Sequence, residues 1–446
     1  MRAFIETLKN IWKIEDLRKR ILYTLGILLV YRLGSFITLP GVDPGQLASL
    51  KAQTAEGVLG LLDMFSGGAF SNASIFALGI MPYISASIVV QLLGIAVPYF
   101  QRLQKEGESG RRKMNQITRY LTVFILVLQA PSYLANLHAQ IPESAFIIKG
   151  STFTISSVVI MTAGTMFIMW LGERITDRGI GNGISLIIMI GIIARLPFAT
   201  VAEFGARLEQ QGGGLVAFLV ELVVLFIVFM FSILLVQGTR RIPVQYAKRI
   251  IGNKQYGGVR QYIPLKVNAA GVMPIIFAQA LMFIPLTIAG FANSEKLTGF
   301  AAAFANFTGF WYNLVFAILI IAFTYFYTAV TINPQQMAED MKRNGGFIPG
   351  VKPGRKTMEF LDSIMSRITL PGSIFLAFIA ILPAFAQLAG ISSQFASFYG
   401  GTSLLILVGV VLDTLQQIES HLLMRHYDGL MKSGRIKGRM GSASAM

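Results

Sequence analysis

Histidines are the side chains of this sequence best suited to proton transfer or metal binding, and their spacing builds no site. His138 stands far from His421 and His426, and no HExxH or GxSxG motif occurs. There is no cysteine, which excludes disulfides and cysteine-based metal or catalytic sites. The ATP-binding loop GxxxxGK[ST] is absent too. Any energy-requiring step of this chain must therefore draw on a partner or on the membrane potential. We expect no enzyme activity and no cofactor.

Composition places the chain in a membrane. Of 446 residues, 54% are hydrophobic and 13% charged, against about a quarter charged in soluble domains. Ten apolar runs approach the roughly 20 residues that a spanning helix needs. They cover 21–39, 73–97, 117–138, 152–172, 182–199, 215–237, 268–291, 310–332, 367–389 and 401–424.

The basic residues predict the orientation of these runs. Of 38 lysines and arginines, 32 flank the runs on one side and five on the other, with Arg32 inside a run. The positive-inside rule then places both termini in the cytoplasm. Ten spans with both ends on one side divide into two inverted halves, 21–199 and 215–424. Residues 1–20 are expected to form a cytoplasmic amphipathic helix, and 425–446 a cytoplasmic tail.

One stretch breaks the pattern. Gly57 to Phe70 is apolar but too short to cross a bilayer, and the run 73–97 follows at once. Half a helix leaves backbone groups unpaired in lipid, so it must be buried in protein or line a cavity. We expect a re-entrant segment hinged at Gly67-Gly68. An interfacial helix resting on the outer surface is the alternative.

Two cytoplasmic loops, 238–266 and 333–366, mix basic residues with aromatics, glycine and proline. This composition favours ordered hairpins that project into water. Topogenesis alone would explain a few charges, but the length of these loops favours docking of an acidic protein patch or an RNA backbone. The basic charge of the chain as a whole also favours anionic lipid as a partner.

Seven blocks of sequence resemble the SecY family, whose members are the main subunit of the bacterial protein-conducting channel. The blocks are YRLGSFITLPGVD (31–43), MFSGGAFSNASIFALGIMPYISASI (64–88), GERITDRGIGNGISL (172–186), RRIPVQYAKR (240–249), PLKVNAAGVMP (264–274), FIPGVKPGRKT (347–357) and FYGGTSLLILVGVVLD (398–413). The resemblance implies an all-α membrane protein in the cytoplasmic membrane. Ten transmembrane helices would form two inverted five-helix halves, with a re-entrant plug helix.

The family resemblance also implies a central constriction with a plug below it. The plug positions that match are Gly57, Leu61, Asp63, Phe65, Gly67 and Gly68. The pore ring that matches is Ile80, Ile84, Ile184, Ile188, Ile276 and Ile406. An apolar ring offers no ligand to ions and resists wetting, so it seals around a passing polypeptide without binding it. Lipid-facing packing is the alternative role for any of these isoleucines.

Sideways release of membrane segments requires a seam, which the family resemblance places between spans 2 and 3 on one side and spans 7 and 8 on the other. Polar residues in these spans that could act as a weak latch are Gln91, Gln129 and Asn268. The same amides could instead hold a static bundle together. Arg32 should face protein or a water-filled funnel, or reach an interface, and a pair with an acidic residue is one reading.

The partners that the resemblance implies are the ribosome, the motor ATPase SecA, the small subunits SecE and SecG, and signal sequences with nascent polypeptides. The docking candidates are Arg240, Arg241, Lys248, Arg249, Lys254, Arg260, Lys352, Arg355, Lys356 and Tyr427. Many bacterial relatives have arginine where this chain has Lys352, so a bidentate contact is in doubt here. Tyr427 could also be an interfacial anchor.

A secondary transporter for a small solute is the main rival. It would share the inverted halves, but it should bring charged or polar residues together at the midplane. The spans here are nearly free of charge.

Overall fold

The computed structural model describes residues 12, 14–47, 50, 60, 63–148, 150–209, 214–246, 249–251, 254–256, 260–279, 281–282 and 308–432. The longer helices are α2 (Glu15–Gly34), α5 (Met81–Ala96), α6 (Pro98–Lys105), α7 (Glu108–Gln140), α8 (Ser151–Arg178), α9 (Gly183–Glu209), α10 (Gly214–Gln237), α13 (Phe310–Thr331), α14 (Pro334–Arg343), α15 (Arg355–Leu388) and α17 (Gly401–Lys432). The short elements are η1 (Pro44–Gln46), η2 (Glu143–Ala145), α16 (Ser393–Ala396), β1 (Thr239–Tyr246), β2 (Arg249–Ile251), β3 (Lys254–Tyr256), β4 (Arg260–Lys266) and β5 (Gly346–Phe347).

The long helices coincide with the apolar runs of the sequence. Within the described ranges, seven helices are long and apolar enough to cross a membrane, and the pair α5 and α6, bent by 99°, would be an eighth. Nine of the ten predicted runs overlap a described helix, and the run 268–291 is helical over 273–279 and 281–282. The chain is a multi-pass helical membrane protein, and the count of ten spans stays a prediction.

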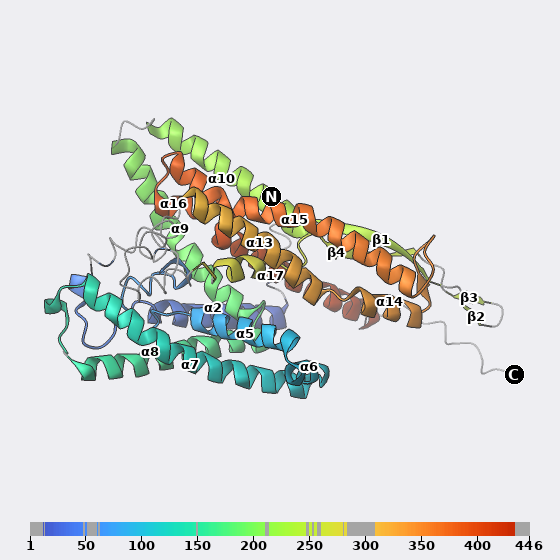
Figure 1. Ribbon diagram of the computed structural model, residues 1–446, viewed down its shortest axis with the longest axis horizontal. Coiled ribbons are helices and arrows are strands. Elements are labelled where there is room, and N and C mark those ends of the chain that lie inside the picture. Colours follow the sequence, from blue (N-terminus) through green and yellow to red (C-terminus); the bar gives the residue numbers. More distant parts are fainter. Residues whose placement is uncertain are drawn as a thin grey trace.

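The helices form two groups that meet along α9 (Figure 1). α2, α5, α7 and α8 make up the first group, and α10, α13, α15 and α17 the second. α9 packs on α8 of the first group and on α10 and α17 of the second. The central apolar cluster contains Leu28 of α2, Ile188 of α9 and Ile406 of α17. The two groups therefore share one core at their junction.

The second span begins later than the sequence predicts. Residues 66–80 form consecutive turns and one isolated bridge, and α5 starts only at Met81. Ala73 and Gly79 have left-handed φ values of 43° and 56°, which a helix cannot contain. Pro82 then sits in the first turn, where its missing N–H costs nothing. Ile80 is consequently the N-cap residue of α5, and its carbonyl oxygen accepts a hydrogen bond from the backbone N–H of Ile84 at 3.1 Å.

The two loops 238–266 and 333–366 fold together. β1 and β4 form the expected antiparallel hairpin, in which Arg241 pairs with Pro264, and β2 and β3 form a second antiparallel pair. The hairpin expected over 333–366 is wrong. That segment forms α14, the short strand β5 on the free edge of β1, and the start of α15.

The local sequence explains this outcome. The side chain of Asn333 accepts hydrogen bonds from two backbone N–H groups of the first turn of α14, and Pro334 follows at its first position. Ile242, Leu265, Met341 and Leu361 then bury one apolar core between sheet and helices. The two loops are therefore a single folded body.

The amphipathic helix expected over 1–20 is not separate from the first span in the part that is described. α2 begins at Glu15 and continues without a break to Gly34. Ion pairs from Lys19 to Glu15 and from Arg20 to Asp16 stabilise its exposed first turns.

Candidate functional site

The six isoleucines singled out in the sequence fall in one apolar cluster. Ile80, Ile188 and Ile406 are buried, and Ile84, Ile184 and Ile276 are half-buried against the same cluster. They come from the start of α5, from α9, from the helix at 273–279 and from α17. Both groups of helices contribute, so the cluster lies where the two groups meet.

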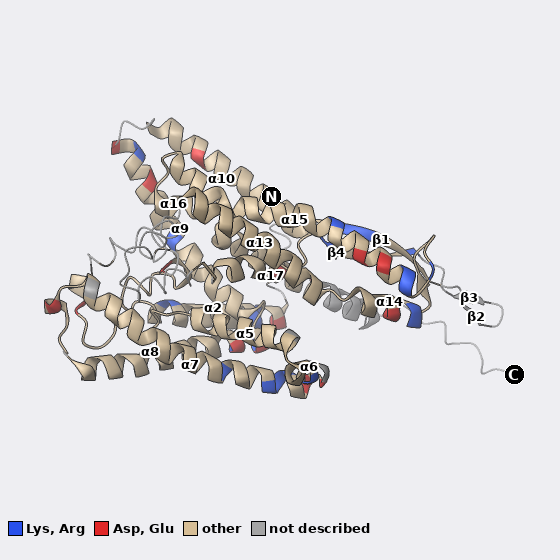
Figure 2. Ribbon diagram, viewed as in Figure 1, with Lys and Arg blue, Asp and Glu red and all other residues tan. Residues whose placement is uncertain are grey.

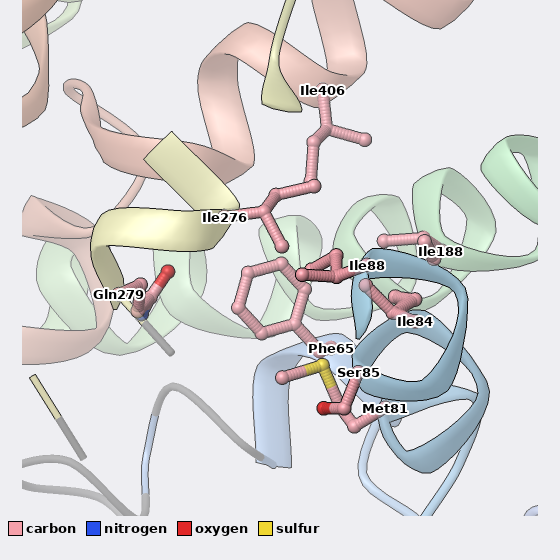
Figure 3. Close-up of a pocket in the computed structure, with 9 residues that line it drawn as sticks. All are labelled: Phe65, Met81, Ile84, Ser85, Ile88, Ile188, Ile276, Gln279 and Ile406. Carbon is pink, nitrogen blue, oxygen red and sulfur yellow. The ribbon is translucent and has the colours of Figure 1, made fainter. Parts of the chain in front are cut away.

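Four of the six line a cavity of about 20 Å³ between the two groups of helices (Figure 3). These are Ile84, Ile188, Ile276 and Ile406; Ile80 and Ile184 belong to the surrounding cluster but not to the lining. The other lining residues are Phe65, Met81, Ser85, Ile88 and Gln279. A cavity of this volume holds at most one or two water molecules. Most of its walls are apolar, so a space of this size is poorly wetted.

Sequence reasoning missed part of this lining. Ile88 lies one helical turn beyond Ile84 on α5, so an i, i+4 pattern would have found it. Gln279 had no comparable signal, since it is an amide within an apolar run; its Oε1 accepts a hydrogen bond from Thr402 of α17 at 2.6 Å.

Phe65 belongs to the segment that precedes α5 and also lines the cavity. Its ring lies beside Ile276 and Ile88 (Figure 3). Every residue from Asp63 to Phe70 is buried, which agrees with a segment inside the bundle and not with an interfacial helix. Gly57 and Leu61 lie outside the described residues.

The backbone of this segment is held by side chains of two helices. The hydroxyl of Tyr31 on α2 donates to the carbonyl oxygen of Ser66 at 3.2 Å, and that of Tyr133 on α7 donates to Phe70 at 3.0 Å. Gly67 and Gly68 have φ values of 65° and 92°. Both glycines are required by this turn, because other residues rarely adopt these angles.

Asp63 has a partner that the sequence did not indicate. Its carboxylate is fully buried and forms an ion pair with Arg195 of α9. The other carboxylate oxygen accepts a hydrogen bond from the backbone N–H of Ser71 at 2.8 Å. A separation of 132 residues leaves no spacing signal, although a buried carboxylate requires a cation or several donors.

The acidic partner considered for Arg32 is not present in the described structure. Its guanidinium instead donates to the carbonyl oxygen of Gly67 and lies 4.7 Å from the ring centroid of Phe36. Arg32 therefore faces protein, as one of its predicted environments required.

The three polar residues expected at the seam differ in burial and in hydrogen bonding. Gln91 of α5 accepts a hydrogen bond from the hydroxyl of Tyr327 on α13 at 3.4 Å, which joins the two groups of helices. Gln129 is exposed on α7 and has no hydrogen-bond partner among the described residues. Asn268 is buried, and its Oδ1 lacks a partner within the described part of the chain. Only Gln91 makes a contact across the expected seam, and Tyr327 was not anticipated.

The basic candidates that the structure describes lie on the folded body formed by the two loops (Figure 2). Arg240, Arg241, Arg260 and Lys352 are exposed. Arg355 and Lys356 are exposed too, but both contact the carboxylate of Glu359, at 3.1 and 3.2 Å.

The remaining docking candidates are Lys248, Arg249, Lys254 and Tyr427. Lys248 lies outside the described residues. Arg249 and Lys254 lie on β2 and β3, and Tyr427 on α17, with only their backbone described.

Comparison with known proteins identifies the family. The SecY family model matches residues 74–415. The protein translocase subunit SecY of Streptomyces scabiei is 45% identical over 441 residues, which cover 94% of this chain and 98% of that protein. The protein of the same name from Mycobacterium bovis is 44% identical over 456 residues, 97% of this chain and 100% of that one.

Solved structures of low sequence identity share the fold. A protein-conducting channel aligns with a TM-score of 0.60 at 19% identity, over 90% of this chain and 92% of that one. Sec61 in a canine ribosome–channel complex aligns with a TM-score of 0.56 at 18% identity, with the same coverage.

Proposed function

The chain belongs to the SecY family, and from this premise we propose that it is a protein-conducting channel. It passes unfolded secretory polypeptides across the bacterial plasma membrane and releases transmembrane segments sideways into the bilayer. The constriction of about 20 Å³, lined by isoleucines from both groups of helices, carries this proposal.

The pore ring acts as an adjustable seal. Ile84 lies on α5 of the first group, and Ile276 lies on the helix at 273–279, which packs with α13, α15 and α17 of the second group. Separation of the groups would move these side chains apart and widen the passage. Branched aliphatic side chains offer no hydrogen bond to a passing peptide, so they close around the chain without holding it. Phe65 and the segment 63–70 form the plug against one side of this seal.

Sideways exit uses the contact of α5 with α13. Gln91 and Tyr327 are joined by one long hydrogen bond, and the ring of Phe277 lies 6.2 Å from that of Tyr327. An intramembrane hydrogen bond of this kind contributes about 0.6 kcal/mol. A weak polar contact is what an apolar signal sequence could displace by offering better packing.

The folded body of the two loops is the docking surface for a motor or a ribosome. Its exposed arginines and lysines attract an acidic protein patch or the phosphates of RNA. The motor SecA, the ribosome and the small subunits SecE and SecG are the partners proposed for this chain, with both termini in the cytoplasm.

A crosslinking experiment tests the proposal directly. The chain holds no cysteine, so each single-cysteine variant carries one thiol. Ile84→Cys and Ile276→Cys, in complexes reconstituted into vesicles, are expected to crosslink to a preprotein stalled by a folded domain. Ile155→Cys on α8 and Ile318→Cys on α13, both exposed on the described chain, are matched controls and should give no crosslink.

The rival reading predicts the reverse result. A solute transporter would carry a small-molecule flux, and a stalled preprotein would crosslink to neither ring position. That outcome would remove the channel proposal.

A further inference from the structure

An ion pair with Arg195 holds the plug segment against α9. Arg195 Nη2 pairs with Asp63 Oδ2 and also donates to the hydroxyl of Ser71 at 3.1 Å. The Ser71 hydroxyl in turn donates to the carbonyl oxygen of Gly68 at 3.2 Å. One guanidinium therefore holds both ends of the loop from Asp63 to Ser71.

A second arginine holds the same loop from the opposite helix. Arg32 of α2 donates to the carbonyl oxygen of Gly67, at the tip of the turn. A Cβ atom added to Gly67 would lie 3.3 Å from Arg32 Nη1, and one added to Gly68 would lie 3.4 Å from Arg195 Nη2. Both glycines therefore lie directly against a guanidinium group.

Helix α9 is shaped to receive the loop at this point. Gly191 lies one turn before Arg195 on α9, so both face the same side of the helix. A methyl group on Gly67 would come within 2.8 Å of the Cα atom of Gly191. The backbone of the loop thus contacts the backbone of α9, directly beside the ion pair.

We propose that Arg195, assisted by Arg32, is the positioning residue that keeps the plug seated in the resting channel. This inference rests on the proposed function and deepens it. The Asp63–Arg195 ion pair sets how readily the segment 63–70 leaves the constriction, while the isoleucine ring determines what can pass afterwards.

The energetics of buried ion pairs suit a reversible fastening. Asp63 is 0% exposed, and the Arg195 side chain is 26% exposed. Desolvation offsets much of the attraction within a buried pair, so releasing both partners into water together costs little. Removing one partner costs much more, because it leaves a buried charge unpaired. The pair therefore excludes a half-released plug and still allows full displacement.

The test uses reconstituted complexes without any preprotein. Arg195→Gln should raise the resting ion conductance and make Ser66→Cys, a buried plug position, react faster with a water-soluble maleimide. We expect an increase on the order of tenfold, less than for a fully buried pair because Arg195 is partly exposed. Arg178→Gln, an exposed arginine at the end of α8, is the control and should change neither readout.

A charge exchange separates positioning from folding. Asp63→Arg alone and Arg195→Asp alone should both leak, and the double variant should return toward the resting conductance of the parent. Arg195→Lys should leak much less than Arg195→Gln, because lysine keeps the positive charge.

Two results would overturn the proposal. One is a parent-like conductance and maleimide rate in Arg195→Gln; the other is a double exchange that leaks as much as the single variants. Either result leaves channel function intact if ring crosslinks to a stalled preprotein persist. Absence of those crosslinks from Ile84→Cys and Ile276→Cys complexes that keep both Asp63 and Arg195 would instead overturn the proposed function.

Discussion

Arg207, in the last turn of α9, forms an ion pair with Glu221 of α10, with 2.6 Å between Nη2 and Oε1. The same guanidinium pairs with Glu203 at 3.0 Å and donates to the carbonyl oxygen of Gly390 at 2.8 Å. Glu203 also accepts a hydrogen bond from the backbone N–H of Ser392 at 3.0 Å. One arginine thus joins α9, α10 and the turn after α15.

Replacing Arg207 with glutamine should destabilise the protein strongly, because two buried carboxylates, 1% and 8% exposed, would lose their shared cation. Loss of one partner of a buried pair costs about 3–5 kcal/mol. The melting temperature of the detergent-purified complex measures the effect, with Arg178→Gln as control. Equal melting temperatures for the two variants would contradict the prediction.

Gly191→Ala should disturb the plug. The added methyl would lie 3.1 Å from the carbonyl oxygen of Phe65 and 3.2 Å from the backbone nitrogen of Gly67, so the loop must shift. Overpacking of this kind costs about 1–3 kcal/mol. We expect a higher resting ion conductance in planar bilayers.

Gly205→Ala on the same helix is the matched control for Gly191→Ala. Nothing lies within 4 Å of the added methyl there, and alanine favours helix by up to about 1 kcal/mol. The proposed packing of plug on α9 fails if the two variants conduct equally.

Ile188→Ser should let water into the constriction, since it removes bulk and adds a hydrogen-bonding group to an apolar wall. The expected result is an ion leak in the resting state, with translocation of preprotein retained. Ile188→Leu keeps the volume and should seal nearly as well as the parent. A tight Ile188→Ser channel would argue against sealing by this cluster.

Tyr327→Phe should loosen the contact of α5 with α13, because the hydroxyl that donates to Gln91 is lost. The lost hydrogen bond is worth about 0.6 kcal/mol, which corresponds to a roughly threefold change in the equilibrium between closed and parted helices. Translocation of a preprotein with a weakened signal sequence is the sensitive readout and should increase. Tyr325→Phe, two residues earlier on α13, is the control, and an increase of the same size there would refute a specific role of the hydroxyl.

Neighbouring basic residues on the docking surface should contribute unequally. Lys352 is exposed and has no ion pair within the described chain, whereas Arg355 is already paired with Glu359. Lys352→Gln should therefore weaken association with ribosomes or with the motor more than Arg355→Gln, and the difference should shrink at high salt. Lys352→Arg should strengthen binding if the partner offers a bidentate phosphate or carboxylate. Binding isotherms at two salt concentrations measure both effects.

The sequence by itself determined that this chain is a helical membrane protein and where most of its helices lie. Hydropathy acts locally, because each spanning segment must satisfy its own backbone hydrogen bonds in lipid. The sequence also indicated the positions of the isoleucines, through the family resemblance, and the hairpin of β1 and β4.

Only the tertiary structure decided which distant side chains meet. Asp63 and Arg195 are 132 residues apart, and Arg207 serves two carboxylates from different helices. The Asp63–Arg195 and Arg207–Glu221 pairings leave no trace in spacing, because a buried charge selects its partner by position in space; only Glu203, four residues before Arg207 on α9, has the spacing of a helical ion pair. The start of α5 at Met81 and the folding of 333–366 onto β1 were decided in the same way, by turns and packing contacts that act across the chain.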